Sequence, residues 1–192
     1  MARPKAFDRD QALLGALGIF RAKGFEATSI QDLVDGTGIN RQSLYDTFGD
    51  KEALYHEALD RYRAEAPQPV FSALEGPLPL RRAVAALFEG VITYLLSPEG
   101  QPCFLAHAAL ARAGEDAQTA SSVQLGFKDS LRRWEARFRR AQAEGELGSH
   151  HDPAALALVF QNALHGLQVT ARSGARRADL DAIARGTLSV LG

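Results

Sequence analysis

The spacing of apolar residues constrains the fold most, because they recur every three or four positions along almost the whole chain. This spacing places them on one face of an α-helix. An alternation of apolar and polar residues, typical of a half-buried strand, is nowhere sustained for more than a few positions. We therefore predict an all-α fold of about nine helices.

Composition and charge favour an ordinary globular protein and exclude several other classes. Hydrophobic residues make up 46% of the 192 positions and charged residues 23%. No apolar run reaches the ~18 residues of a membrane span, and no secretory signal opens the chain. One cysteine excludes an internal disulfide and fits a reducing compartment. We expect a cytoplasmic protein with no membrane partner.

Polar capping residues divide the first part of the chain into four short helices. A side-chain oxygen at such a position accepts hydrogen bonds from the free amides of the first turn. Gln31 stands three residues after the second cap, which is the capping-box spacing. Gly24 is suited to end the first helix in a conformation that glycine adopts cheaply. The predicted caps are Asp8, Thr28, Asn40 and Asp50.

A cluster of prolines and glycines between residues 67 and 79 marks a linker or domain junction. We predict two domains, residues 1–51 and residues 66–192, connected by a helix over residues 51–65. The second domain should hold five helices. Their predicted ranges are 80–96, 103–113, 116–143, 153–173 and 179–191.

Two of the short helices are joined by Asp35-Gly36-Thr37-Gly38 and match a helix-turn-helix, whose second helix enters the major groove of DNA. Arg41, Gln42 and Ser43 stand at the start of that second helix, where it would meet base edges. Arginine can hold guanine, and glutamine adenine, through two hydrogen bonds each. The sequence therefore predicts a base-reading surface here.

Other residues around this motif are suited to phosphate contacts. Thr28 and Ser29 open the first helix of the motif, where hydroxyls, free amides and the helix dipole favour an anion. Tyr45 and Lys51 carry polar groups on long stems, and a basic arm precedes the fold. The predicted DNA-binding residues are Arg3, Lys5, Thr28, Ser29, Asn40, Arg41, Gln42, Ser43, Tyr45 and Lys51.

The charge of the chain weighs against binding nucleic acid by bulk electrostatics. The formal net charge is −1, and residues 1–51 hold seven basic and seven acidic residues. Affinity for DNA must then rest on a local patch. Asp46 would also repel a phosphate if it faced DNA. These features support the alternative, a helical ligand-binding or metal- or redox-sensing protein with little DNA-binding activity.

Within this motif, the block from Gly24 to Leu54 reads GFEATSIQDLVDGTGINRQSLYDTFGDKEAL. This block resembles the TetR family of one-component repressors. Four patterns are in register with that family: the GF-x-x-T-S/T-I run, the G-I/V start of the third helix, the S/T-L-Y within that helix and the F-x-x-K-E/D-x-L that follows. The resemblance implies a nine-helix subunit and the phosphate and base contacts named above. It also implies a homodimer formed by the last two helices, which include Leu164-His165-Gly166-Leu167.

We therefore predict a sequence-specific transcriptional regulator, a repressor that leaves a palindromic operator when a small-molecule effector binds its second domain. The aromatic residues of that domain either fill its core or line an apolar cavity, and the sequence leaves both open. They favour an apolar or aromatic effector. The candidate ligand-binding residues are Phe88, Tyr94, Cys103, Phe104, His107, Phe127, Trp134, Phe138 and His165.

Cys103 and His107 lie four residues apart, a spacing compatible with metal ligation. His150 and His151 offer further ligands in a loop. A small buried thiol and ordinary loop histidines are the simpler interpretation, so we expect no metal and no cofactor. We also predict no enzyme, since no phosphate-binding glycine loop, nucleophile elbow or zinc-protease motif is present.

Overall fold

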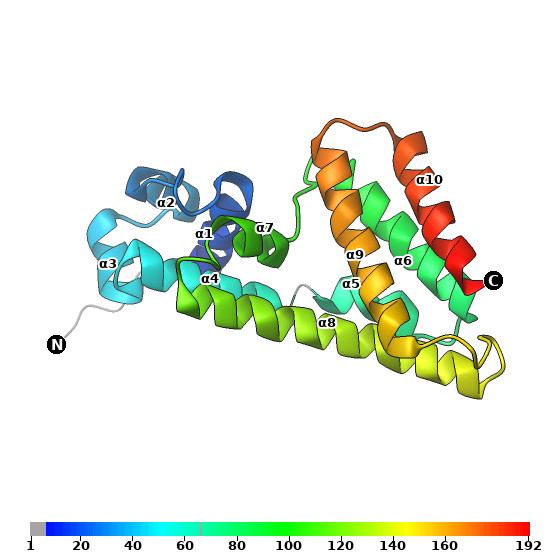
Figure 1. Ribbon diagram of the computed structural model, residues 1–192. Helices are drawn as coiled ribbons and strands as arrows, with labels where there is room; N and C mark the ends of the chain where they lie inside the picture. Colours follow the sequence, from blue (N-terminus) through cyan, green and yellow to red (C-terminus); the bar gives the residue numbers. More distant parts are fainter. Residues whose placement is uncertain (1–6, 66) are drawn as a thin grey trace. The chain divides into compact units, whose positions relative to one another are not determined.

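The computed structural model describes residues 7–65 and 67–192, and all regular structure in these ranges is helical (Figure 1). This confirms the predicted all-α class. The described residues form ten α-helices and a final 3₁₀ turn. Their bounds are α1 Arg9–Lys23, α2 Ile30–Thr37, α3 Arg41–Phe48, α4 Lys51–Glu65, α5 Pro67–Glu75, α6 Leu80–Leu95, α7 Phe104–Ala111, α8 Ala117–Ala143, α9 Pro153–Arg172, α10 Arg177–Leu188 and η1 Ser189–Leu191.

Helix α5 lies in the proline-rich segment, for which the sequence predicts a linker or domain junction and no helix. Proline lacks an amide hydrogen, but the amides of a first helical turn have no intrahelical partner. Pro67 and Pro69 both fall in that turn and are therefore compatible with a helix. The segment from Gly76 to Pro79 remains as the short connection to α6.

Three of the four predicted caps are confirmed. The Asp8 carboxylate accepts hydrogen bonds from the amides of Asp10 and Gln11 at 2.9 and 3.3 Å. The Asn40 side-chain oxygen accepts from an amide of the first turn of α3 at 2.8 Å, and Asp50 does the same for α4 at 2.8 Å. Short polar side chains therefore define where these three helices begin.

The fourth cap was assigned one residue too early. Ser29, not Thr28, caps α2, and it forms a reciprocal capping box with Asp32. The Thr28 side chain is only 1% exposed, and its hydroxyl donates to the carbonyl oxygen of Gly24 at 2.5 Å. Adjacent hydroxyl residues satisfy the same sequence pattern, and only burial of one of them distinguishes the two positions.

The chain folds into two compact units, which do not follow a single cut in the sequence. The first unit contains residues 7–65 together with residues 104–123. The second contains residues 67–103 and 124–192, so α8 contributes to both. The functional division into a DNA-reading and a ligand-sensing domain stays a prediction.

The first unit is built around aromatic side chains. Helix α1 packs against α2 and α4, and α7 packs against α4. The ring of Tyr55 on α4 meets Phe20 of α1 edge-on at 5.2 Å and Phe104 of α7 at 5.4 Å. All three are buried, and burying side chains of this size is the main stabilising contribution in a small helical unit.

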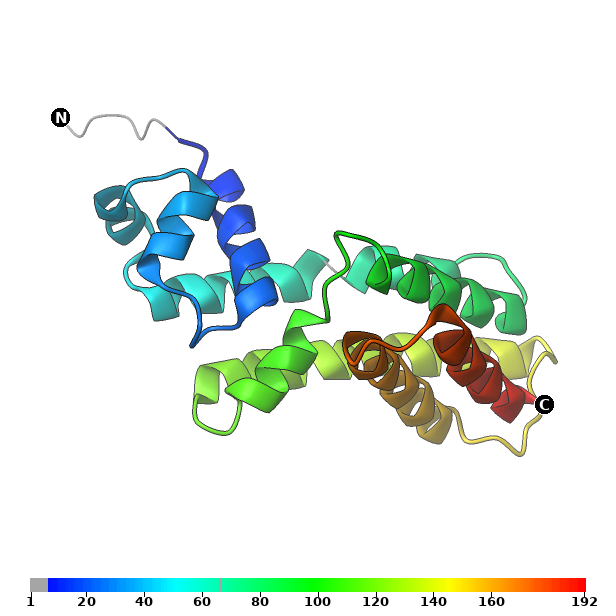
Figure 2. The ribbon, with the colours of Figure 1, turned by 90° about the horizontal axis from the view of Figure 1, so that it is seen from above.

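The second unit has a separate aromatic core. Helices α6, α9 and α10 pack together (Figure 2), and α8 supplies Trp134 and Phe138. Trp134 lies 5.8 Å from Phe138 and 5.5 Å from Phe160 of α9, measured between ring centroids. No helix in the described part of the chain is long and apolar enough to cross a membrane.

Gly24 ends α1 with φ 80° and ψ 171°, a region that side-chain-bearing residues rarely adopt. We expect Gly24→Ala to lower the free energy of unfolding by about 2–3 kcal/mol. A β-carbon there would also lie 2.9 Å from the ring of His107, which must shift.

Gly38 provides the matched control, because it is left-handed with φ 70° but has open space around its would-be β-carbon. Gly38→Ala should cost about 1 kcal/mol. Urea unfolding at a fixed protein concentration measures the loss of unfolding free energy in each variant. Equal losses in Gly24→Ala and Gly38→Ala would contradict the greater backbone strain and the contact with His107 at Gly24.

Candidate nucleic-acid interface

Two buried side chains fix the orientation of helix α3. Leu44 and Phe48 lie one turn apart and are buried in the first unit. The opposite side of the helix must then face solvent. Gln42 and Tyr45 are exposed to one side of Leu44 and Phe48, with Tyr45 40% accessible. Arg41 shares the helical face of Leu44 and Phe48 by its spacing, and it is exposed because it stands at the first position of the helix. The helix therefore presents long polar side chains from its first turns.

The beginning of α3 is stabilised by a side-chain cap. Asn40 is exposed, but its side-chain oxygen is occupied by the amide of Ser43. Ser43 itself is half-buried. Asn40 and Ser43 are both predicted DNA-binding residues. The cap does not use the carboxamide nitrogen of Asn40 or the hydroxyl of Ser43.

Asp46 does not stand as an isolated charge. It accepts a hydrogen bond of 2.9 Å from the side-chain nitrogen of Gln42, one turn earlier on the same exposed face. A glutamine that binds adenine with two hydrogen bonds needs that nitrogen free. Gln42 must therefore release Asp46 before it can hold a base in this way.

At the start of α2 the two predicted phosphate contacts are placed differently. Ser29 is exposed at the N-terminus of the helix, but its amide and its hydroxyl both donate to the Asp32 carboxylate at 2.8 Å. Its hydroxyl must release that carboxylate before it can donate to a phosphate. Thr28 is buried with its hydroxyl bonded to the carbonyl of Gly24. Its side chain consequently does not fit the predicted contact, which sequence pattern alone could not exclude.

Lys51 has an internal role that the sequence did not reveal. Its ammonium group donates to the carbonyl oxygens of Phe25 and Thr28, at 3.0 Å each, and lies 4.1 Å from the centre of the Phe25 ring. Two of its three hydrogens are engaged in this way. Lys51 thus holds the loop that leads into α2 and positions Ser29. The predicted Arg3 and Lys5 lie outside the described residues.

The electrostatics of the α2 cap centre on Asp32. Lys23 lies 2.5 Å from one carboxylate oxygen, and the Ser29 amide donates to the other at 2.8 Å. The hydrogen bond from Lys23, followed by those from Ser29, lowers the pKa of Asp32 to about 2. The carboxylate is therefore charged at neutral pH and stabilises the positive end of the helix.

The predicted ligand-binding residues fall into several environments. Phe88, Trp134 and Phe138 are buried members of the second unit's core, and Tyr94 is exposed. Phe104 is buried in the first unit against Tyr55. The structure therefore does not gather the predicted set in one place.

His107 also belongs to the first unit, where it lies against Gly24. Cys103 belongs to the second unit and is half-buried, and its amide donates to the side-chain oxygen of Gln168 at 2.6 Å. Neither His107 nor Cys103 belongs to the group of potential metal ligands that is found among the described residues. That group consists of Glu52, His56 and Asp116.

A chain of polar contacts runs along the inner side of α9 in the second unit. Trp134 donates to the side-chain oxygen of Gln161 at 3.2 Å, and the Gln161 nitrogen lies 2.8 Å from Nε2 of His165. An amide nitrogen only donates, so His165 accepts and its ring is neutral. Burial also lowers the pKa of His165, whose ring lies 4.8 Å from that of Phe127.

Comparison with known proteins decides the family. A model described as "Bacterial regulatory proteins, tetR family" matches residues 12–58. The HTH-type transcriptional repressor ComR of Escherichia coli (strain K12) is 32% identical over 97% of this chain and 90% of its own. The chain belongs to the TetR family of transcriptional regulators. The predicted family, fold and regulatory class are confirmed.

Other relatives agree with this assignment. The HTH-type regulator YezE of Bacillus subtilis (strain 168) is 32% identical over 94% of this chain and 93% of its own. A solved structure of the TetR-family regulator CifR, a cysteine mutant in complex with 26-bp operator DNA, is 32% identical with a TM-score of 0.88. It covers 99% of this chain and 100% of its own.

The lowered pKa of Asp32 makes the α2 cap sensitive to acid. An unfolded aspartate has a pKa of about 3.9, so the folded state holds its proton less tightly. The stabilising contribution is complete above pH ~4 and is lost as the pH falls toward ~2. Urea midpoints of wild type and Asp32→Asn should therefore differ at pH 5 and converge toward pH 2.

Lys23→Gln tests the assigned cause, because it removes the strongest hydrogen bond to Asp32. The urea midpoint of Lys23→Gln should therefore change less between pH 5 and pH 2 than that of wild type. If the difference in urea midpoint between wild type and Asp32→Asn stayed constant from pH 5 to pH 2, the pH dependence of stability would not come from this carboxylate.

Proposed function

We propose that this TetR-family chain represses transcription by binding a near-palindromic operator as a homodimer, and that a small-molecule effector releases it. The relative ComR is named a repressor, and the relative CifR was solved on operator DNA. The chain's function on this proposal is binding, and none of its residues is assigned a catalytic role.

The observation that carries the proposal is the exposed start of α3. Arg41 and Gln42 are exposed in the first turn of a helix that Leu44 and Phe48 anchor in the first unit. A rigid helix with guanidinium and carboxamide groups at its N-terminal end suits the major groove. Ser29 and Tyr45 flank it as phosphate contacts, while Lys51 acts by positioning the loop before α2.

Helix α9 supports the homodimer. Leu158, Val159 and Val169 lie on it with roughly half or more of their side chains exposed, and Gly166 is also exposed. Their spacing places them on one side of the helix, together with the exposed Asn162, and an exposed surface that is mostly apolar favours an interaction site. Two copies related by a two-fold axis would present two α3 helices to half-sites one DNA turn, about 34 Å, apart.

The polar contacts along α9 support a site for the effector in the second unit. Gln161 and neutral His165 provide hydrogen-bonding groups beside the aromatic rings of Phe127 and Trp134. Such a combination suits a small, mostly apolar molecule with one or two polar atoms. A 100-fold loss of operator affinity requires the effector to prefer the released state by about 2.7 kcal/mol.

Fluorescence anisotropy with DNA from upstream of the protein's own coding region tests the proposal. Binding that is specific for sequence, and that weakens linearly in log–log form as salt rises, is expected. Equal, weak binding to unrelated DNA, together with no fragment enriched in a genome-wide selection, would instead favour a helical binding protein without operator recognition.

Arg41→Ala should weaken operator binding by about 1–3 kcal/mol, because it removes a two-bond contact to a base, and should relax specificity at that base pair. Competition anisotropy with operators mutated one base pair at a time gives both quantities. Arg139→Ala on α8, whose guanidinium is exposed and paired with Glu135, is the control and should bind like wild type. Unchanged specificity in Arg41→Ala would remove it from the base-reading set.

Val169→Glu should shift the chain toward monomer, because it places a charge in the proposed dimer surface, where an unpaired charge is costly. Sedimentation velocity over a concentration series measures the shift. Leu110→Glu is the matched control, since Leu110 is 85% exposed on α7 of the first unit. A dimer equally stable in both variants would place the interface elsewhere.

A further inference from the structure

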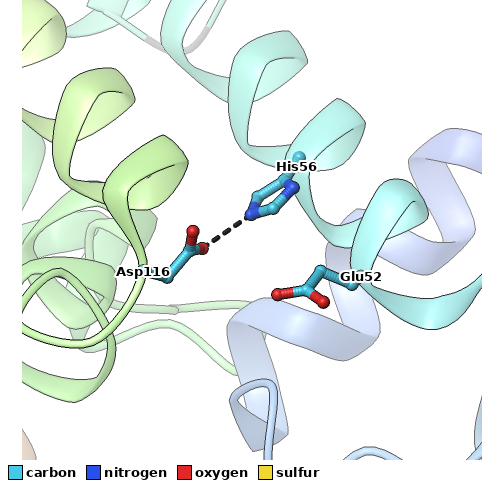
Figure 3. A group of neighbouring side chains, drawn as sticks. All are labelled: Glu52, His56 and Asp116. Carbon is cyan, nitrogen blue, oxygen red and sulfur yellow. Dashed lines mark hydrogen bonds and ion pairs between the residues drawn. The ribbon is translucent and has the colours of Figure 1, made fainter.

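Three potential metal ligands converge in the first unit (Figure 3). Glu52 and His56 lie one turn apart on α4, and Asp116 lies directly before α8. One ligand atom from each of the three side chains lies within 4.8 Å of the others. Nε2 of His56 donates to the Asp116 carboxylate at 2.6 Å, and His56 is only 9% exposed. Imidazole and carboxylate are thus already desolvated and adjacent.

A second feature of the same region gives solvent access to the site. An open groove of about 530 Å³ is lined by Asp50, Glu52, Ala53, His56, Glu57, Asp60 and Gln118. Three of its four acidic residues are ion-paired: Glu52 with Arg112, Glu57 with Arg9 and Asp60 with Arg63. The groove is therefore an open path to Glu52 and His56 whose negative charge is largely compensated.

One guanidinium nitrogen of Arg112 contacts both carboxylates of the site, and a bound ion must displace it. The Arg112 guanidinium lies 2.5 Å from Glu52 and 3.5 Å from Asp116, and it also lies 3.8 Å from the centre of the Phe25 ring. It does not line the groove. A bound ion would compete with this arginine for the carboxylates, so the site should be of moderate affinity.

The Asp116 carboxylate is held in place by hydrogen bonds. It accepts them from the Thr119 hydroxyl, from His56 at 2.6 Å and from the amide of Gln118 at 3.1 Å. Thr119 also fixes the orientation of the carboxylate. Supporting bonds of this kind orient the ligands of metal sites.

We propose that Glu52, His56 and Asp116 form a binding site for a divalent transition-metal ion of the zinc class. One imidazole and two carboxylates are ligands that such ions accept, with water in the fourth position. Bonds of about 2.0–2.2 Å in a tetrahedral site place ligand atoms about 3.3–3.5 Å apart. His56 and Asp116 must then separate slightly, and the proton that Nε2 of His56 shares with Asp116 must move to Nδ1, so that Nε2 can bind the ion. The exposed Glu52 side chain must move inward.

The ion would link α4 to the segment 104–123 inside the first unit. A polar contact between the same two parts already exists one turn further along, where Ser122 donates to Asp60 at 2.8 Å. Because α4 follows α3 directly, metal binding would stiffen the support of the DNA-reading helix. This site is separate from the proposed effector site and does not depend on operator binding.

Isothermal titration of the full chain with zinc chloride tests the site. Wild type should bind one zinc ion per chain, and His56→Gln and Asp116→Asn should bind roughly tenfold more weakly or not at all, since each loses one of three ligands. Zinc should also raise the melting temperature of wild type, because a ligand of the folded state stabilises it. Both variants should show a smaller increase or none at the same zinc concentration.

The double variant His150→Gln/His151→Gln is the control, because these loop histidines, whose ring centroids lie 4.1 Å apart, could hold zinc on their own. It should bind like wild type. Circular dichroism first establishes that each variant is folded. If Asp116→Asn is not, Glu52→Gln replaces it, since the Glu52 side chain is largely exposed. Absence of zinc binding in wild type, full affinity in His56→Gln, or loss only in the double variant would overturn the proposal.

Discussion

The first unit depends on the burial of one aromatic ring, that of Tyr55. Phe20, Phe25 and Phe104 meet it edge-on, with ring centroids 5.1 to 5.4 Å away. These partners come from α1, from the loop before α2 and from α7. Burial raises the pKa of Tyr55 to about 12, so the ring stays neutral. One side chain of α4 therefore fixes three other parts of the chain around the helix that follows α3.

The DNA-reading surface is a consequence of this packing. Leu44 and Phe48 hold α3 against the unit, so the remaining side of the helix is available for polar residues. Lys51 secures the loop before α2 from the first turn of α4. Contacts within the first unit therefore determine the orientation of α3, the loop before α2 and the caps of both helices. A surface that is preorganised in this way loses less conformational entropy on binding DNA.

Much of the fold could be predicted because the signals are local. Apolar spacing gives the helices, and a polar residue such as Asp8 or Asn40 gives a helix start. Local signals fail where two residues satisfy the same pattern, as Thr28 and Ser29 do, and where proline both breaks and begins helices, as at Pro67.

The candidate sites were harder to predict, because they depend on what each side chain meets in the folded chain. The sequence predicts a phosphate contact for Lys51, whereas in the folded chain its ammonium group donates to two backbone carbonyl oxygens. Glu52 and His56 have the one-turn spacing of possible ligands, a signal that was present but not distinctive. Asp116 comes from a distant part of the sequence, and no spacing rule connects it to them.

The composition of the first unit has a consequence for how such regulators can be recombined. Residues 104–123 complete this unit, and Phe104 covers the ring on which it is built. A fragment ending at Glu65 would leave that ring uncovered. A chimera that joins this reading head to another sensor must therefore carry over the matching surface of the second segment, and relatives can exchange heads only where that surface is compatible.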